Sequence, residues 1–415
     1  MSPEAPEGAL PGVTTEWGRE GGPLSAVRWL TEDVRFRVKH GEFGPLPVIV
    51  GLTIIWTFFQ FQNSAFLTPR NMSNLVLQIA VTGVIAIGIV FVLLLGEIDL
   101  SVGSVAGLTS AVLGVLTVQM HWPWWAAILA MLAVGTAVGA FHGAWFAVFG
   151  VPSFIVTLAG LLGWQGVQLH VLGDTGTINV FDTRITAIAN TFLPDIFGWI
   201  LVVVVAGGFA GARVLELGRR RSAGLPAGLI YATVAKTLGI LVVLVVVVAV
   251  LNAAGGVPTA GVILLGLVAC AAWITTRTKL GRYIFAVGGN AEAARRAAIS
   301  TRSIRISAFA IAGFFAAVGG LISVARLSAA STQTGGGTLL LEAIAAAVIG
   351  GTSLFGGRGT VWAALLGALV LGSVSNGLDL IGQPADVKLI VEGVILLLAV
   401  TVDALSRRGR ASAGR

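Results

Sequence analysis

Twelve long apolar runs, separated by polar connections, take up most of this chain and constrain its fold more than any other feature. Many of them approach the ~20 apolar residues that a helix needs to cross a bilayer. Charged residues make up only 11% of the 415 residues, whereas a soluble domain carries about 25%. Too few charges are therefore present to cover a water-facing surface. The sequence predicts an all-α, polytopic transmembrane helical bundle and excludes soluble enzymes, disordered chains and secreted disulfide scaffolds.

Several runs are shorter than a full span, and glycine clusters stand where neighbouring runs meet, at Gly96, Gly350-Gly351 and Gly356-Gly357. Such interruptions are typical of broken or re-entrant helices that line a protein-enclosed cavity. We expect about 10–12 spans, including broken or re-entrant ones. The runs are Pro47–Gln62, Leu75–Leu95, Leu100–Val118, Trp124–Phe149, Phe154–Leu172, Ile196–Ala212, Leu229–Leu251, Gly261–Trp273, Ile306–Ala325, Leu339–Ile349, Val361–Val374 and Leu389–Val402.

Lysine and arginine residues are distributed very unevenly between the two sides of the predicted bundle. If the spans alternate from a cytoplasmic N-terminus, 22 of the 26 fall on the cytoplasmic side, leaving only Arg70, Arg184, Arg326 and Lys388 outside. Because basic loops stay in the cytoplasm, we expect a multi-pass protein of the inner membrane with both termini cytoplasmic. The same bias accounts for the net charge of +7 without a nucleic-acid partner.

The polar connections divide the chain into three parts. We expect a cytoplasmic tail over residues 1–45, partly disordered because it is polar and rich in Pro, Gly and Glu, a transmembrane domain over residues 46–405, and a cytoplasmic tail over residues 406–415. Within the domain, residues 173–194 form a long outer connection and residues 276–305 a strongly basic inner one. This inner loop is the largest on its side and could receive a partner.

The chain lacks the motifs that would give it an enzymatic activity of its own. It has no G-x-x-x-x-G-K-[ST] phosphate-binding loop, no H-E-x-x-H zinc motif, no G-x-S-x-G nucleophile elbow and no Cys/His cluster with metal-ligand spacing. The four histidines lie on separate segments, so we expect packing or interfacial roles for them. The sequence predicts no catalytic residues, no metal and no cofactor, and favours transport over enzymatic activity.

Two carboxylates, Glu97 and Asp99, stand in GEIDLSVGS, where the second apolar run gives way to the third. Asp99 precedes the expected helix, and a carboxylate there can accept hydrogen bonds from free backbone N–H groups and is favoured by the helix dipole. We interpret the pair as a helix-start device. A hinge or a cytoplasmic contact is the functional alternative. A proton relay is disfavoured, because the pair falls at the cytoplasmic end and not in mid-membrane.

Four motifs occur in a fixed order along the chain: GEIDLSVGS (Gly96–Ser104), VPSFIVTLAG (Val151–Gly160), GRYIFAVGGNAEAAR (Gly281–Arg295) and AIAAAVIGGTSLFGGRGT (Ala343–Thr360). Together they resemble the permease subunits of bacterial ABC importers for monosaccharides, the ribose/galactose/xylose group, and the resemblance covers residues 46–405. The basic linker Ala212–Ala227 and the GVPT sequence at Gly256–Thr259 are most similar to the D-xylose permeases within that group.

The resemblance implies a permease subunit that moves a monosaccharide, a pentose such as D-xylose, across the cytoplasmic membrane. It also implies a homodimer with the sugar path at its two-fold axis, a cytoplasmic sugar-type ABC ATPase, and a periplasmic or lipid-anchored sugar-binding protein, all assembled in membrane lipid. The apolar segments are nearly free of charge, which independently suits a neutral sugar. A self-sufficient secondary carrier or channel for a small neutral solute is the alternative.

By the same resemblance, the contact with the ATPase lies in the basic inner loop, around Ala286–Ile299. Its Gly-Gly-Asn sequence is turn chemistry that opens a short helix, and such a helix suits insertion into a groove on a partner. A solvated basic loop that only follows the positive-inside rule is the alternative. The family has a glycine where this chain has Ala298, which leaves the turn geometry open. The matching positions are Gly288, Gly289, Asn290, Glu292, Ala293, Ala294, Arg295 and Ile299.

Polar residues close to the expected two-fold axis are the candidates for the translocation path. The resemblance places the break at Gly350–Gly359 and the fifth apolar run near that axis. Each of these residues could instead form a hydrogen bond between helices, so both interpretations stay open. The candidates are Ser153, Thr157, Gln165, Gln168, Thr352, Ser353 and Asn376.

Overall fold

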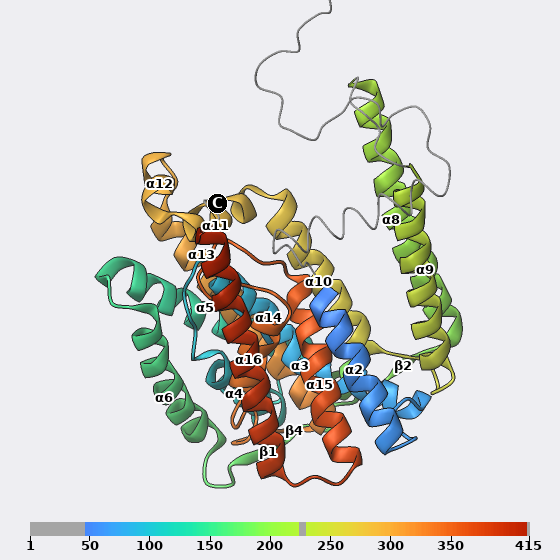
Figure 1. The fold of residues 1–415 in the computed structure, drawn as a ribbon. Helices are drawn as coiled ribbons and strands as arrows, with labels where there is room; N and C mark the ends of the chain where they lie inside the picture. The colour runs from blue at the N-terminus through green and yellow to red at the C-terminus, as the bar shows by residue number, and fades with distance from the viewer. Residues whose placement is uncertain (1–45, 224–229, 413–415) are drawn as a thin grey trace, which may run out of the picture. The chain divides into compact units, whose positions relative to one another are not determined.

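The computed structural model describes residues 46–223 and 230–412. The expected N-terminal tail, residues 1–45, lies outside this description. The chain divides into two compact units, both drawn in Figure 1. The larger unit consists of Gly44–Asp195 and Val250–Arg415, and the described part of the smaller one lies within Ile196–Ala249.

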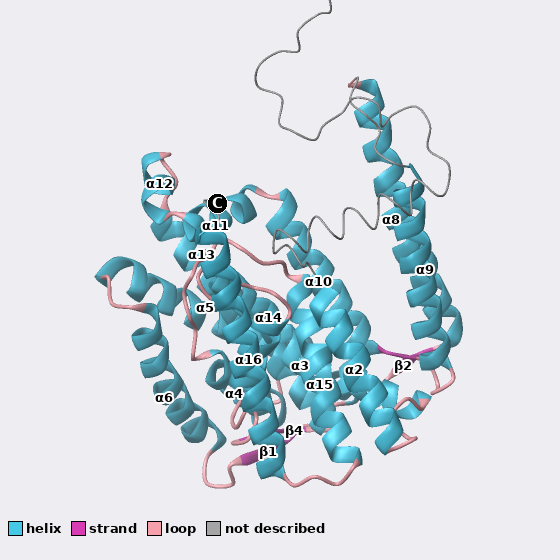
Figure 2. Cartoon of the chain, viewed as in Figure 1, coloured by secondary structure: helices cyan, strands magenta, loops and turns pink. Residues whose placement is uncertain are grey.

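The described chain is almost wholly helical, with four short strands (Figure 2). Each apolar run predicted from the sequence overlaps a helix, and one helix continues as a π-helical turn, η1 (Val115–Gln119). The helix over Asp195–Ser222 extends beyond its predicted run into the expected basic linker Ala212–Ala227. The helices are α2 (Leu46–Gln62), α3 (Pro69–Leu94), α4 (Val102–Gly114), α5 (Trp124–Phe149), α6 (Ser153–Leu172), α7 (Thr183–Asn190), α8 (Asp195–Ser222), α9 (Ile230–Asn252), α10 (Thr259–Arg277), α11 (Lys279–Gly289), α12 (Ala291–Arg296), α13 (Thr301–Leu327), α14 (Leu339–Ile349), α15 (Trp362–Leu380) and α16 (Ala385–Ser412).

Nine of the helices in the described residues are long and apolar enough to cross a membrane. They are α3, α4 with η1, α5, α6, α8, α9, α10, α13 and α15. Helices α2 and α14 are shorter and apolar, and α16 adds 28 residues. The all-α membrane bundle predicted from composition is therefore confirmed. Because α16 continues to Ser412, the expected tail from residue 406 is helical as far as it is described.

The long helix α13 joins the two ends of the larger unit. Helix α12 precedes α13, and we name this the α12 end. Strand β4 (Ala329–Ser331) follows α13 and pairs antiparallel with β1 (Thr177–Asn179) near α7, and we name this the α7 end (Figure 1). The four basic residues predicted to lie outside stand on α3, α7, α13 and α16 toward the α7 end. Which side of the membrane each end faces stays a prediction.

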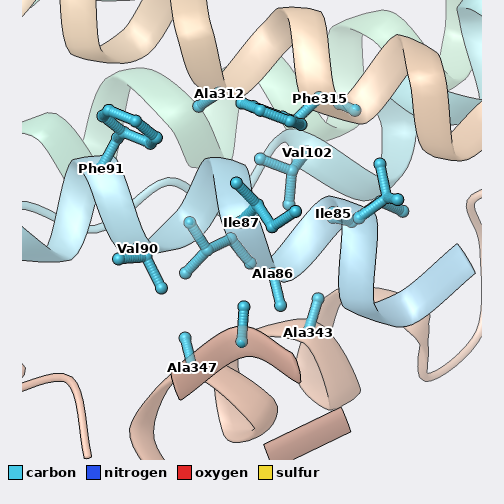
Figure 3. Close-up of a cluster of buried hydrophobic side chains, with 14 of the residues drawn as sticks. Ile85, Ala86, Ile87, Val90, Phe91, Val102, Ala312, Phe315, Ala343 and Ala347 are labelled. Carbon is cyan, nitrogen blue, oxygen red and sulfur yellow. The ribbon is translucent and has the colours of Figure 1, made fainter. Parts of the chain in front are cut away.

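Helices α3 and α13 form the buried frame of the larger unit. In their most apolar 18-residue windows, 78% of α3 and 83% of α13 is buried. Figure 3 shows part of this core, in which Phe91 of α3 faces Phe315 of α13 with ring centroids 6.3 Å apart. Ala343 and Ala347 bring α14 against the opposite face of α3. Small side chains on α14 thus allow three helices to meet in one apolar layer.

In the sequence, Gly135, Gly139 and Gly143 are spaced by four, which predicts a glycine face for close helix contact. Helix α5 packs directly against α13 through this face. A Cβ atom on Gly135 would stand 2.6 Å from the carbonyl oxygen of Gly313, and one on Gly139 would overlap the carbonyl of Phe309. Backbone contact of this kind is the use that membrane helices make of small residues spaced by four. The predicted close helix contact is confirmed.

The span between β4 and α15 is broken, as its glycines predicted. Residues 332–338 form turns that run into the unit, where Gly335 packs against Gly103 near the start of α4. Helix α14 then has only 11 residues. It leads into the break loop, residues 350–361, which is not helical. The Gly103-x-x-x-Gly107 face of α4 therefore accommodates a re-entrant turn at Thr334 and Gly335 together with the Gln168 side chain of α6.

The smaller unit contains α8 and α9. Only 11% of the apolar window of each helix is buried. At the α7 end of the larger unit, β2 (Phe192–Leu193) pairs with β3 (Val257–Pro258), and Asn252 Nδ2 donates to the carbonyl oxygen of Asp195 at 3.3 Å. The two chain segments that lead into and out of the smaller unit are therefore held together.

Candidate functional site

Three connections of the larger unit meet at its α12 end: the α3–α4 connection, the α11–α12 junction and the break loop. The N–H of Gly357 donates to the carbonyl oxygen of Leu94 at 2.8 Å. A Cβ atom on Gly288 would overlap that same carbonyl, and one on Gly356 would stand 2.7 Å from the carbonyl oxygen of Gly288. The three connections are in backbone-to-backbone contact, which only glycine permits at this distance.

Helix α12 is short, capped and charged on its exposed side. Asn290 Oδ1 accepts a hydrogen bond from the N–H of Ala293 at 2.9 Å, which is the geometry of a helix N-cap. Glu292 forms exposed ion pairs with Arg295 at 3.5 Å and Arg296 at 3.4 Å. Exposed pairs contribute little to stability, so these charges are free to exchange partners. The helix expected after Gly288 and Gly289 is present.

The turn after α12 closes around Ala298. The N–H of Ile299 donates to the carbonyl oxygen of Ala294, and that of Ala298 to Arg295, both at 3.0 Å. These two bonds make a Schellman motif, and φ of Ala298 is +60°. The alanine adopts the left-handed conformation that glycine favours, at a cost of about 1 kcal/mol. The sequence left the turn geometry open, and the structure shows that a helix-terminating turn forms with alanine at this position.

Glu97 links this end of the unit to two helices. Its Oε2 accepts from the hydroxyl of Ser153 at 2.7 Å, and its Oε1 lies 3.6 Å from Nη2 of Arg305. The guanidinium of Arg305 also lies 4.5 Å from the ring centroid of Phe146. Burial raises the pKa of the Glu97 carboxyl, while the Ser153 hydrogen bond and the Arg305 charge act in the opposite direction. One carboxylate thus joins the α3–α4 connection to the starts of α6 and α13.

Asp99 begins a second, buried chain of hydrogen bonds. Its Oδ1 accepts from the N–H of Ser101 at 2.8 Å and from its hydroxyl at 2.6 Å. Ser101 Oγ lies 3.1 Å from His142 Nδ1, and Trp164 Nε1 donates to His142 Nε2 at 2.8 Å. Because an indole N–H only donates, the network assigns a neutral His142 with its proton on Nδ1. Asp99 orders the residue that precedes α4, and does not cap the first turn of that helix directly.

The candidates for the translocation path on α6 have different surroundings. Ser153 and Thr157 are buried against the α3–α4 connection, where the Thr157 hydroxyl lies 3.4 Å from the carbonyl oxygen of Ile98. Gln168 is buried toward the α7 end, and its Nε2 donates to the carbonyl oxygens of Ser331 and Thr334 at 2.9 and 3.1 Å. Gln165 is exposed.

The remaining candidates lie at opposite ends of the unit. Thr352 and Ser353 are buried in the break loop, and the hydroxyl of Thr352 has no partner among the described residues. Asn376 exchanges amide hydrogen bonds with Asn71, at 2.7 and 3.1 Å, and so joins α15 to α3. The seven candidates do not form one cluster in a single copy of the chain. Their contact with a sugar stays a prediction.

Arg305, His142 and Trp164 take part in these networks, although sequence reasoning did not single them out. Arg305 counted only as a charge on the basic side, and His142 only as a packing residue. Their partners are distant in sequence: Ser101 and His142 are 41 residues apart. The one available signal was the position of His142, an imidazole inside an otherwise apolar run.

Comparison with known proteins assigns this chain to a family. Residues 71–400 match the family described as branched-chain amino acid transport system / permease component. The xylose transport system permease protein XylH of Escherichia coli (strain K12) is 38% identical over 87% of this chain and 92% of its own length. XylH of Haemophilus influenzae is 35% identical over 90% of this chain and 99% of its own length. The ribose import permease protein RbsC of E. coli (strain K12) is 35% identical over 86% of this chain and 92% of its own length. No solved structure is significantly similar to the chain.

The chain belongs to this family of transport-system permease components. The match runs from α3 into α16 and includes all four motifs. The chain is a multi-pass permease component of the inner membrane, as the resemblance of its motifs indicated.

Proposed function

We propose that this chain is the membrane subunit of an ATP-driven importer that carries a pentose, D-xylose, across the cytoplasmic membrane. The similarity to XylH over nearly the full length, which includes α11 to α13, carries the proposal. The family description names branched-chain amino acids, but an amino-acid zwitterion needs charged partners. The buried polar side chains of the described residues are hydroxyls and amides, with Asp99 and His142 the exceptions. Such groups suit a neutral sugar.

In this proposal the α12 end faces the cytoplasm and binds a separate sugar-type ABC ATPase. The capped helix α12, with Glu292, Arg295 and Arg296 exposed, supplies a compact contact surface. Two copies of the chain associate around the sugar path, and a periplasmic or lipid-anchored sugar-binding protein delivers the sugar at the α7 end. Both chain termini are cytoplasmic.

Reconstitution tests the proposal directly. Proteoliposomes containing the chain, a candidate sugar-type ATPase and a candidate sugar-binding protein should accumulate labelled D-xylose only when ATP is present. Excess unlabelled D-xylose should suppress the signal more than excess ribose. Uptake by the chain alone, without ATP, would contradict an importer subunit.

The contact at α12 is tested by pull-down of the ATPase. Gly289→Pro removes backbone freedom at the α11–α12 junction, and Arg295→Glu reverses an exposed charge on α12. A well-placed interface residue can contribute more than 2 kcal/mol, so each variant should lose at least about tenfold in ATPase binding. Arg70→Glu, an exposed charge reversal at the α7 end, is the matched control. Undiminished ATPase binding by both loop variants would contradict the contact and support the alternative of a solvated basic loop.

Orientation and self-association need separate measurements. A reporter that is active only in the periplasm, fused after Arg415, should be silent, and activity there would reverse the assignment of the two ends. The detergent-corrected mass of the ATPase-bound complex should correspond to two copies of the chain. A single copy in the assembled complex would contradict the dimer.

One observation favours the alternative of a secondary carrier. Glu342 and Glu392 line a cavity of about 80 Å³ between α14, α15 and α16, and intramembrane carboxylates are the usual means of ion coupling. Both oxygens of Glu342 accept hydrogen bonds, from Thr338 at 2.5 Å and Thr82 at 3.3 Å. The cavity is also smaller than the roughly 300 Å³ at which ligand sites begin. A proton gradient that drives uptake without ATP would support this alternative.

A further inference from the structure

The chain segment before α12 reaches Glu97 through close backbone contacts. Gly288, at the end of α11, lies against Leu94 and Gly356 at the junction described above. Gly96 directly precedes Glu97, and a Cβ atom on it would stand 3.2 Å from the carbonyl oxygen of Phe355. Backbone atoms in such contact cannot move independently, because packed interiors transmit displacement. A shift of the α11–α12 junction is therefore imposed on the residue before Glu97.

The chain segment after α12 reaches the same carboxylate by a different route. The turn at Ala298 leads into α13, whose start is capped by Ser300, with Ser303 N–H donating to its hydroxyl at 3.4 Å. Arg305 lies in the second turn of α13 and contacts Glu97 Oε1. Both ends of α12 are thus linked to one side chain, which makes Glu97 the point where a displacement of α12 converges.

Glu97 passes this displacement to one helix in particular. Its other oxygen, Oε2, holds the hydroxyl of Ser153, the first residue of α6. Only 22% of the apolar window of α6 is buried, and side-chain hydrogen bonds fasten the helix along one face, from Ser153 to Gln168. A side-chain hydrogen bond contributes only about 1 kcal/mol net, so it can break and reform at low cost. A displacement of the Glu97 carboxylate can therefore either move the start of α6 with it or break the hydrogen bond to Ser153.

We infer that Glu97 is a positioning residue that transmits displacement of α12 to α6, through Arg305 on one oxygen and Ser153 on the other. This inference rests on the proposed function, in which an ATPase moves α12. When α12 shifts, the α3–α4 connection and the start of α13 shift with it, and the Glu97–Ser153 bond draws the start of α6 along. Because the start of α6 carries Ser153 and Thr157, two of the candidate path residues, this motion changes the width of the path at the α12 end.

The test uses the full complex of the chain with its ATPase and binding protein, and measures D-xylose transported per ATP hydrolysed. Glu97→Gln retains an acceptor for Ser153 and removes the charge that attracts Arg305, whereas Ser153→Ala removes the bond to α6. We expect both variants to bind the ATPase within twofold of the wild type and to continue hydrolysing ATP. Sugar transported per ATP should fall about threefold in Glu97→Gln and at least tenfold in Ser153→Ala.

Two further variants separate a transmitting role from a structural one. Ser153→Thr retains the hydroxyl and should restore most of the sugar-to-ATP ratio. Ser307→Ala makes the same chemical change on α13, where the hydroxyl donates to the carbonyl oxygen of Ser303 in its own helix, and should leave the ratio unchanged. A structural role predicts less assembled protein and proportional losses of both activities.

The inference is overturned if Ser153→Ala keeps the wild-type ratio, or if transport and hydrolysis fall together in every variant. A wild-type complex that binds the ATPase and the binding protein but shows no ATP-dependent uptake would refute the proposed function itself. That failure appears before any variant is made, so the two are distinguishable.

Discussion

Helices α13 and α6 are both long enough to cross a membrane, but they are held in the larger unit in opposite ways. Helix α13 is 83% buried in its apolar window and meets α5 backbone to backbone at Gly139 and Gly313. Helix α6 is 22% buried in its window and packs against α4 and α5. Its ends are fastened by Ser153 and Gln168, whose side chains form hydrogen bonds.

This difference separates a frame from a movable part. A glycine-mediated contact has one close-packed arrangement, and any other leaves atoms overlapping or voids unfilled. A side-chain hydrogen bond contributes only about 1 kcal/mol net and can exchange partners. A permease that alternates between states needs both kinds of helix, and α6 is the one whose attachments can change at low cost.

The largest expected effect comes from breaking the frame. In Gly139→Leu the new side chain would overlap the carbonyl of Phe309, and overpacking in a core without room costs about 3 kcal/mol or more. We expect no monodisperse protein, or a sharply lower midpoint of thermal unfolding in detergent. Gly163→Leu on α6 is the matched control, because no atom of the described residues lies within 4 Å of a Cβ atom added there, and it should change stability by no more than about 0.5 kcal/mol. Equal losses in both variants would remove the distinction between the helices.

A smaller effect should follow from loosening α6 at its α7 end. Gln168→Leu keeps the size of the side chain but removes the donor to the carbonyl oxygen of Thr334, whereas the carbonyl oxygen of Ser331 still accepts from the N–H of Thr334. Unsatisfied buried groups cost about 1–3 kcal/mol. Hydrogen exchange should therefore accelerate over residues 153–172 and stay unchanged over residues 301–327. Acceleration of both segments to the same extent would show that α6 and α13 open as one unit.

A small, local gain in stability is expected in the turn that follows α12. Ala298→Gly relieves the left-handed conformation, φ +60°, and should stabilise the turn by about 1 kcal/mol relative to alanine. The gain should appear as slower hydrogen exchange at Ile299, whose N–H closes the Schellman motif, with α6 unaffected. A loss of stability would mean that glycine's greater freedom in the unfolded chain outweighs the relief.

The smallest expected effect is on the pH dependence of stability, and it comes from Glu97, which links α13 to α6. Burial raises the pKa of Glu97, so the folded protein holds this proton more tightly than the unfolded chain does. That stabilisation is present below the usual pKa and is lost as the pH rises through the raised one. The glutamine of Glu97→Gln cannot ionise. The midpoint of thermal unfolding of this variant should therefore fall less than that of the wild type as the pH rises from the usual pKa to the raised one. Parallel pH profiles would show that Glu97 titrates normally.

Features that depend on short stretches of chain could be predicted well from the sequence. The run Leu339–Ile349 coincides with α14 at both ends, and the three glycines spaced by four on α5 do mediate close packing. Both follow from local hydrophobicity and helical periodicity, which determine where a helix lies and which of its faces carries only small residues. What packs against a glycine face was less predictable. Gly103 and Gly107 of α4 meet a re-entrant turn near Gly335, and Gly107 also meets the Gln168 side chain of α6. Periodicity alone cannot distinguish a turn from a helix as the partner.

The sequence by itself determined the membrane class, the helical segments and the order of the four motifs, because apolar length and charge bias are properties of consecutive residues. Only the tertiary structure decided that Ser153 holds Glu97, that Asn376 pairs with Asn71, and that Gly288, Leu94 and Gly357 meet. These contacts join segments many residues apart, and a hydrogen bond forms only where folding brings donor and acceptor within about 3 Å. No spacing along the chain encodes that distance, which is why the coupling of α12 to α6 became visible only in the fold.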